Sequence, residues 1–184
     1  MSHFAIHTIN SAPAGAKPIL EQLQERVGFV PNLAATMAGS PLVLETWATL
    51  GGIFGRSTFS PAEREIVAMA TSYDNRCTYA MAAHSTFAKA YGASEAVLEA
   101  VRAGKSPSDP RIGALVTFTH QVVRGRGQVP ADELEAFLKA GFTEAQALDV
   151  LIGVSQATLA SFVHTMAGTP LDEGFRPQEW GENT

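Results

Sequence analysis

The segment NRCTYAMAAHS, residues 75–85, contains the chain's single cysteine, Cys77, and a histidine seven positions later, His84. A cysteine attacks as its thiolate, so a reactive thiol needs surroundings that favour the charged form. We expect a helix to begin at Arg76 after an N-cap at Asn75. Cys77 would then lie in the first turn, where free amides and the helix dipole lower the pKa of a thiol. The segment therefore predicts a reactive cysteine.

A carboxylate and an imidazole are expected near this cysteine. His84 lies two helical turns beyond Cys77 on the same face, but a rise of about 10.5 Å is too long for a direct hydrogen bond. A water molecule or another side chain would have to connect the two groups. Ala80 lies one turn before His84 and is expected to touch it. Glu65, on the preceding helix, can reach His84 if a break at residues 74–75 makes a helical hairpin, and it would then orient the imidazole or take its proton.

The elements that must position these side chains are predicted to be helical throughout. Ser60, Pro61 and Glu63 indicate a capping box that opens the helix EREIVAMATSY. The segment 104–110 combines glycine, prolines and serines and is predicted to be a loop, and the residues after Pro170 are predicted to form an extended arm. The other expected helices cover residues 17–27, a run after 40–41 that ends near Gly55, a run from 76 to about 92, one capped by Ser94 to about Val101, and segments 111–127, 131–142 and 144–168.

A faint internal repeat aligns FSPAEREIVAMATSY, residues 59–73, with FTEAQALDVLIGVSQ, residues 142–156. Each copy has a hydroxyl N-cap and a capping-box Glu or Gln, and each is followed by a small-residue helix with one histidine, His84 or His164. Two unrelated capped amphipathic helices would share part of this pattern, so duplication and coincidence both stay open. His120 and His164 are expected to be structural, although His164 would enter the pocket if the halves pack about a pseudo-twofold axis. The organisation predicted is one domain over 1–184, with repeats at about 40–103 and 111–168 and an extended tail at 171–184.

Composition excludes several classes of protein. The 184 residues carry a formal net charge of -5 and no basic cluster, so nucleic acid is not an expected partner. A single cysteine cannot close an intramolecular disulfide, which favours a reducing, cytoplasmic location. No apolar run approaches the roughly 20 residues that cross a bilayer, so no membrane partner is expected. The histidines and acidic residues lack the spacing of metal ligands, and neither a metal nor a cofactor is predicted.

The stretch EREIVAMATSYDNRCTYAMAAHS resembles the signature of the alkylhydroperoxidase D and carboxymuconolactone decarboxylase superfamily, in which a glutamate precedes a Cys-x-x-Cys pair and a histidine follows it. Glu65, Cys77 and His84 fall on these positions. The resemblance implies an all-α, AhpD-like fold and a homo-oligomer, either a trimer or a hexamer. It also implies reduction of hydroperoxides by a thiol, with electrons from an external thiol or a lipoyl-bearing or thioredoxin-like donor.

The sequence departs from this signature at Ala80, which stands where the second cysteine belongs. A dithiol cycle within one chain is therefore excluded, and three hypotheses remain. Cys77 could form a sulfenic acid that an outside thiol resolves, which describes a one-cysteine peroxidase with Cys77, His84 and Glu65 as catalytic residues. Glu65 and His84 could instead perform acid–base chemistry on a lactone acid. The protein could also be an inactive member, or the alanine an engineered change. Tyr79 and Ala80 are the predicted substrate-binding residues.

Overall fold

The computed structural model describes residues 3–181. Within that range the chain consists of α-helices and one 3₁₀ helix, without a β-strand, which confirms the predicted all-α fold. In chain order the helices are α1 (Lys17–Val27), α2 (Asn32–Met37), α3 (Pro41–Phe54), α4 (Pro61–Asp74), α5 (Thr78–Ala90), α6 (Glu95–Arg102), α7 (Pro110–Arg124), α8 (Ala131–Lys139), α9 (Glu144–Ala167) and the 3₁₀ helix η1 (Glu173–Gln178).

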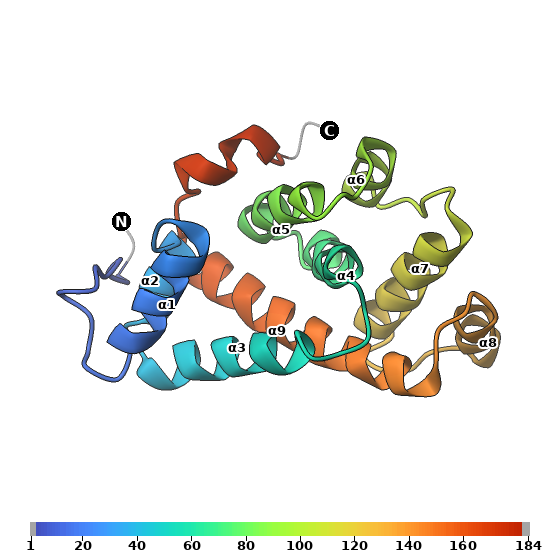
Figure 1. Cartoon of the computed structure of the whole chain (residues 1–184), viewed down its shortest axis with the longest axis horizontal. Helices are drawn as coiled ribbons and strands as arrows, with labels where there is room; N and C mark the ends of the chain where they lie inside the picture. The colour runs from blue at the N-terminus through green and yellow to red at the C-terminus, as the bar shows by residue number, and fades with distance from the viewer. Residues whose placement is uncertain (1–2, 182–184) are drawn as a thin grey trace.

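Helix α9 runs through the length of the molecule, and the other elements are arranged along it (Figure 1). Helices α1 and α2 lie near its C-terminal end and α7 and α8 near its N-terminal end, with the α4–α5 pair between them. Gly153 in the middle of α9 permits this close packing, because an added Cβ would lie 2.7 Å from the ring of Phe54 and 3.0 Å from Val67. The side chains of α4 that face α9 and α7 therefore form much of the core.

Helix α9 also corrects one expectation from composition. Among the described residues it is the helix that is long and apolar enough to cross a membrane, judged by its 24 residues and their composition alone. It packs against α2, α3, α4, α5, α7 and α8, so its inner side belongs to the protein core. Its outer side leaves Leu148, Phe162 and Met166 exposed, at 67%, 63% and 67% of their surface.

Helices α4 and α5 form the predicted hairpin, but their junction differs from the prediction. Asn75 ends α4 instead of capping α5, and Arg76 adopts a left-handed conformation with φ 51°. The amide of Cys77 then donates to the carbonyl of Ser72 at 2.9 Å, which closes a tight turn. Helix α5 therefore begins at Thr78, and Cys77 is its N-cap residue rather than a member of its first turn. A side-chain oxygen is the usual N-cap, so the sequence favoured Asn75 over a sulfur that performs the same task.

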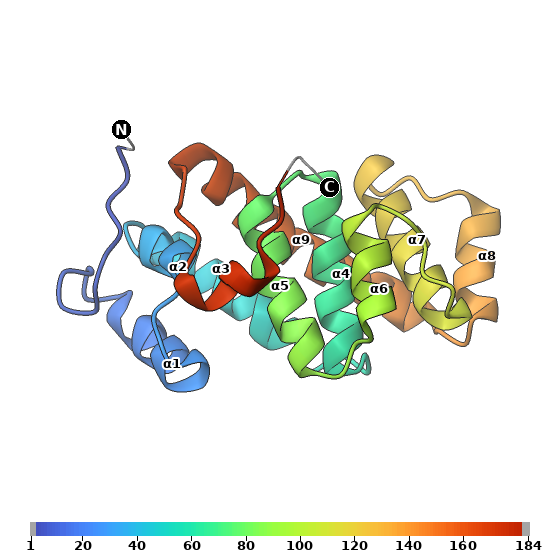
Figure 2. The same cartoon turned by 90° about the horizontal axis from the view of Figure 1, so that it is seen from above.

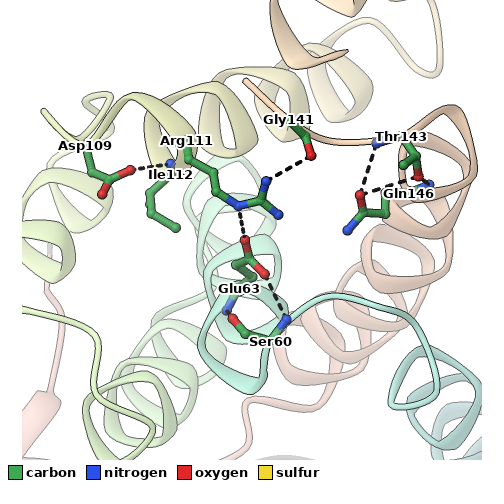
Figure 3. A network of polar contacts seen from close by, with 8 residues as sticks. All are labelled: Ser60, Glu63, Asp109, Arg111, Ile112, Gly141, Thr143 and Gln146. Carbon is green, nitrogen blue, oxygen red and sulfur yellow. Dashed lines mark hydrogen bonds and ion pairs between the residues drawn. The ribbon is translucent and has the colours of Figure 1, made fainter. Parts of the chain in front are cut away.

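Both predicted capping boxes are present, and one arginine connects them (Figure 3). Arg111, at the start of α7, donates to the Glu63 carboxylate at 2.8 Å and to the carbonyl of Gly141 at 3.1 Å. Its guanidinium also lies 3.8 Å from the ring centre of Phe142. Because Glu63 closes the box at the start of α4 and Gly141 precedes the box of α9, Arg111 ties the two helix starts together. The internal duplication itself stays a prediction.

The C-terminal segment is not the extended arm that its polar composition predicted. Residues 173–178 form η1, which packs on α5 and lies across it (Figure 2). Phe175 is buried among the rings of Phe29, Tyr79 and Phe87, with centroid distances of 5.5, 6.0 and 5.6 Å. A single apolar side chain among polar neighbours is enough to dock the segment. The average composition of the segment does not reveal this contact. The last predicted tail residues, 182–184, lie outside the described range.

Candidate active site

Glu65 and His84 form a close pair on facing sides of the α4–α5 hairpin. The Nδ1 atom of His84 lies 2.6 Å from Oε2 of Glu65. The short turn before α5 brings the two helices together, so residues 19 positions apart in sequence become neighbours. Both side chains remain partly accessible, His84 at 25% and Glu65 at 20%. The contact expected from the spacing is therefore present, and both side chains are partly exposed to solvent.

This contact assigns separate tasks to the two nitrogens of His84. With Nδ1–H donating to the carboxylate, Nε2 carries the lone pair and can accept or return a proton. The carboxylate fixes the orientation of the ring and stabilises the imidazolium that forms when Nε2 is protonated. A histidine held by a carboxylate in this way is the usual arrangement for general acid–base catalysis.

Cys77 lies in a different environment from the one predicted. Its side chain is fully buried, with 0% exposure. The sulfur accepts a hydrogen bond from the Ala80 amide at 3.5 Å, and Ser161 and the Tyr79 amide also act to lower the pKa of the thiol. Burial nevertheless raises the pKa of the Cys77 thiol, because the cost of desolvating a thiolate exceeds what these bonds return. The predicted lowering of this pKa by the helix terminus is wrong, and the thiol stays protonated at neutral pH.

The structure therefore joins two of the three predicted catalytic residues. Glu65 and His84 contact each other, whereas the Cys77 sulfur accepts from the Ala80 amide on α5 and is influenced by Ser161 on α9. Among residues 3–181 no hydrogen bond connects the thiol to the His84 ring. The proximity of Ser161 to Cys77 was not predicted from the sequence. The two residues are 84 positions apart, and no local pattern indicates that they pack together.

The burial of Cys77 leads to a direct prediction. We expect its alkylation by iodoacetamide, followed by intact-mass spectrometry, to be slow at pH 7 and to accelerate only above the ordinary pKa range of cysteine. At pH 7 the folded chain should react at least about tenfold more slowly than the same chain unfolded in urea, since the sulfur is both protonated and enclosed. Equal rates for the folded and unfolded chains at pH 7 would contradict the buried placement.

The two predicted substrate-binding residues are both buried, and Tyr79 serves another contact. The Tyr79 hydroxyl donates to the carboxylate of Asp172 and accepts from the Leu33 amide at 3.2 Å. Burial is the main cause that raises its pKa, so it remains a neutral phenol. The Tyr79 hydroxyl therefore helps to hold the C-terminal segment through Asp172. Asp172 was not predicted as a partner of Tyr79 from the sequence. Ala80 places a methyl group one turn before His84, where the signature has a thiol.

The remaining histidines lie outside the Glu65–His84 pair. His120 Nδ1 lies 2.8 Å from the buried carboxylate of Asp74, which also accepts from Arg124 at 2.9 Å. His164 lies beside Tyr79, with ring centroids 5.6 Å apart. In the part of the chain that the structure describes, no group of three or more His, Cys, Asp or Glu side chains is placed to hold a metal ion.

The fold has close counterparts among solved structures. An AhpD-core, uncharacterized peroxidase-related protein from Ralstonia eutropha JMP134 superposes with a TM-score of 0.84 at 23% identity, over 95% of this chain and 94% of that chain. An uncharacterized peroxidase-related protein from Silicibacter sp. TM1040 gives 0.79 at 19% identity, over 94% and 92%. The debrominase Bmp8, solved as an alanine variant with 2,3,4-tribromopyrrole, gives 0.75 at 13% identity, over 97% of both chains. Identities this low establish the fold and no shared activity.

Comparison at the sequence level adds the family. Comparison with curated proteins found no match. A sequence model of the carboxymuconolactone decarboxylase family matches residues 41–109, the segment that contains Glu65, Cys77 and His84. The match covers that segment, and the chain as a whole has the fold of the AhpD-core structure. The resemblance noted from the sequence is thereby confirmed.

The chain has the glutamate–histidine pair of the signature but not its second thiol. Ala80 is 2% exposed, and Cys77, the N-cap residue of α5, is 0% exposed. Glu65 and His84 are therefore partly exposed to solvent, whereas the sulfur is buried.

Proposed function

We propose that this member of the superfamily is an acid–base enzyme, and that Glu65 and His84 transfer a proton during decarboxylation of a lactone that carries a carboxylate. The observation that supports this choice is the 2.6 Å contact between His84 Nδ1 and Glu65 in a partly accessible site. The substrate class follows from the family that matches residues 41–109. Of the three hypotheses left open by the sequence, the burial of Cys77 favours this one over the one-cysteine peroxidase.

One histidine, His84, is enough to supply the proton that the proposed decarboxylation requires. The bond between the lactone carbon and the carboxylate breaks, carbon dioxide leaves, and the electron pair stays on the carbon. Protonated His84 donates its Nε2 proton to that carbon and becomes neutral, and it regains a proton from water. Glu65 keeps the imidazole oriented throughout and stabilises its protonated form through Nδ1.

A one-cysteine peroxidase is the second candidate, and the polar groups beside the Cys77 sulfur favour it. The Ala80 amide donates to the sulfur, and Ser161 and the Tyr79 amide also act to lower the pKa of the thiol, so these groups would stabilise a thiolate if the site opened. A thiolate would attack the outer oxygen of a hydroperoxide, break the O–O bond and release an alcohol, leaving a sulfenic acid. Two equivalents of an external thiol, or a lipoyl or thioredoxin-like donor, would reduce it and release water. Two similar structures are described as peroxidase-related, which is consistent with this candidate.

The substitution Cys77→Ser distinguishes the two candidates. If the pair acts alone, decarboxylation of a lactone acid, followed by carbon dioxide release, should keep at least about half of the wild-type turnover. Reduction of cumene hydroperoxide with dithiothreitol should be near background for the wild type and should not fall further. Hydroperoxide turnover in the wild type that disappears in the variant would reverse the ranking. Neither activity in the wild type would support the inactive member that the sequence also allowed.

A homo-oligomer, as a trimer or hexamer, is proposed from the family resemblance. A cytoplasmic location, with neither nucleic acid nor membrane as a partner, is proposed from the composition. The exposed apolar side of α9 is compatible with assembly, because Phe162 and Met166 are 63% and 67% exposed in the single chain.

A further inference from the structure

One side of helix α9 carries a line of large apolar side chains that the single chain leaves exposed. Successive residues of an α-helix are about 100° apart, so positions 148, 155, 159, 162 and 166 lie within about 40° of one direction. Leu148, Phe162 and Met166 on this line are 63–67% exposed, and Leu151 beside it is 41% exposed. We call the line from Leu148 to Met166 the α9 stripe. It is about 27 Å long.

The α9 stripe is larger than the apolar surface that a monomer ordinarily exposes. Its four large side chains leave on the order of 500 Å² open to water, near the upper end for the largest apolar patch on a monomeric protein. Two such stripes that face each other would bury about 1,000 Å² in total, the lower limit for a specific interface. The stripe therefore has the area that one partner of its own size requires.

The charges of α9 distinguish between the partners that could cover the stripe. From Val150 to Ala167 the helix contains no Asp, Glu, Lys or Arg, so it offers no counter-charge to a charged partner. Helices that lie on a membrane surface carry Lys or Arg on their polar side, and α9 has neither among its 24 residues. The net charge of -5 also gives the chain no attraction to anionic lipid. An uncharged stripe on a second copy of this chain fits these conditions.

We propose that two copies of the chain associate through their α9 stripes, with the two helices antiparallel across a twofold axis. Leu148 of one copy then lies opposite Met166 of the other, and Ser155 lies opposite Leu159 near the axis. The side chains of the stripe recur at spacings of three and four residues, which is the spacing that lets the side chains of two helices interdigitate.

Glu144 decides the relative direction of the two helices. This exposed residue begins α9 on the same side as the stripe. Parallel helices would place the Glu144 carboxylates of the two copies side by side, which is unfavourable for like charges. Antiparallel helices separate the two carboxylates by the length of the stripe and also oppose the two helix dipoles.

The proposed contact has a consequence for the size of the assembly. A twofold contact joins chains in pairs, so it connects two trimers into a hexamer but does not form a trimer by itself. Of the two assemblies that the family resemblance implies, the α9 stripe therefore favours the hexamer. The pairing does not depend on the proposed decarboxylation, because it uses neither Glu65 nor His84.

Sedimentation equilibrium tests the contact. At about 100 µM the wild-type particle should contain an even number of chains. Phe162→Glu, or Leu148→Glu as a second variant, should halve that number, because a carboxylate at the contact should weaken it at least about thirtyfold. Tyr91→Glu makes the same change at an exposed ring outside α9 and should leave the particle mass unchanged. A wild-type particle with an odd number of chains, or a mass that both α9 variants retain, would overturn the proposal.

Engineered cysteines in a Cys77→Ser chain test the direction of the helices. In an equimolar mixture of Leu148→Cys and Met166→Cys chains, oxidation should join unlike chains, which mass spectrometry identifies by their summed mass. Each of the two variants alone should stay unlinked. Leu148→Cys chains that link to each other would show parallel helices and refute the arrangement. Binding of the wild type to phosphatidylcholine vesicles that Phe162→Glu abolishes would assign the stripe to a membrane and would also refute it.

Discussion

Replacing His84 with glutamine should lower kcat for the lactone acid by about 10²–10⁴-fold, the usual contribution of a general acid–base residue. Glutamine can still bond to Glu65 across the hairpin, so the fold and the substrate contacts of the site are retained. It cannot carry the proton that must reach the carbon when carbon dioxide leaves. KM should therefore change far less than kcat, because the lost interaction belongs to the transition state.

Two further histidine and glutamate variants serve as controls for that result. Glu65→Gln keeps a neutral hydrogen-bonding group beside Nδ1 but removes the charge, and we expect it to lose about tenfold to a hundredfold in kcat. His120→Gln makes the same chemical change at the buried pair with Asp74 and should leave kcat per folded molecule unchanged. Retention of a tenth or more of kcat in His84→Gln, with decarboxylation otherwise established, would remove His84 from the mechanism.

The Glu65–His84 contact was predictable because its determinants are local. Ser60 and Glu63 mark the start of α4, and the break near Asn75 marks its end, so both ends of the helix can be predicted from the sequence. With both helices fixed, a single short turn decides which of their residues meet, and the Glu65–His84 contact follows. The exact turn was missed by two residues without consequence for this pair, since Arg76 and Cys77 reorganise the junction but preserve the hairpin.

The environment of Cys77 could not be predicted, because it depends on a distant helix. The sulfur is buried, and Ser161 on α9 acts on its pKa, which no pattern near residue 77 indicates. Backbone amides at the start of α5 do favour the thiolate, as predicted from the sequence. The complete burial of Cys77 outweighs them and raises the pKa of the thiol. Tyr79 shows the same limit, for its partner Asp172 lies 93 positions away.

The C-terminal segment provides the second large expected effect. Phe175 is 2% exposed and inserts between rings from the start of the chain and from α5. Asp172 adds polar attachment, since its carboxylate accepts from the Tyr79 hydroxyl and from the Asn32 amide at 3.1 Å. These anchors join α2, α5 and η1. Loss of the aromatic anchor would leave a hole among three rings and release the C-terminal segment.

Phe175→Ala should therefore reduce the free energy of unfolding by about 3 kcal/mol in urea denaturation, the usual cost of deleting a buried phenylalanine. Undocking of a chain end limits the cost, because the segment can detach while the α4–α5 hairpin stays folded. Proteolysis should accordingly cut after α9 in the variant under conditions that spare the wild type, while the decarboxylase turnover survives. Tyr91→Ala, at a ring 55% exposed, should stay within about 0.5 kcal/mol of the wild type. A loss below about 1 kcal/mol with an uncut C-terminal segment would show that Asp172 and Arg102 hold it without the ring.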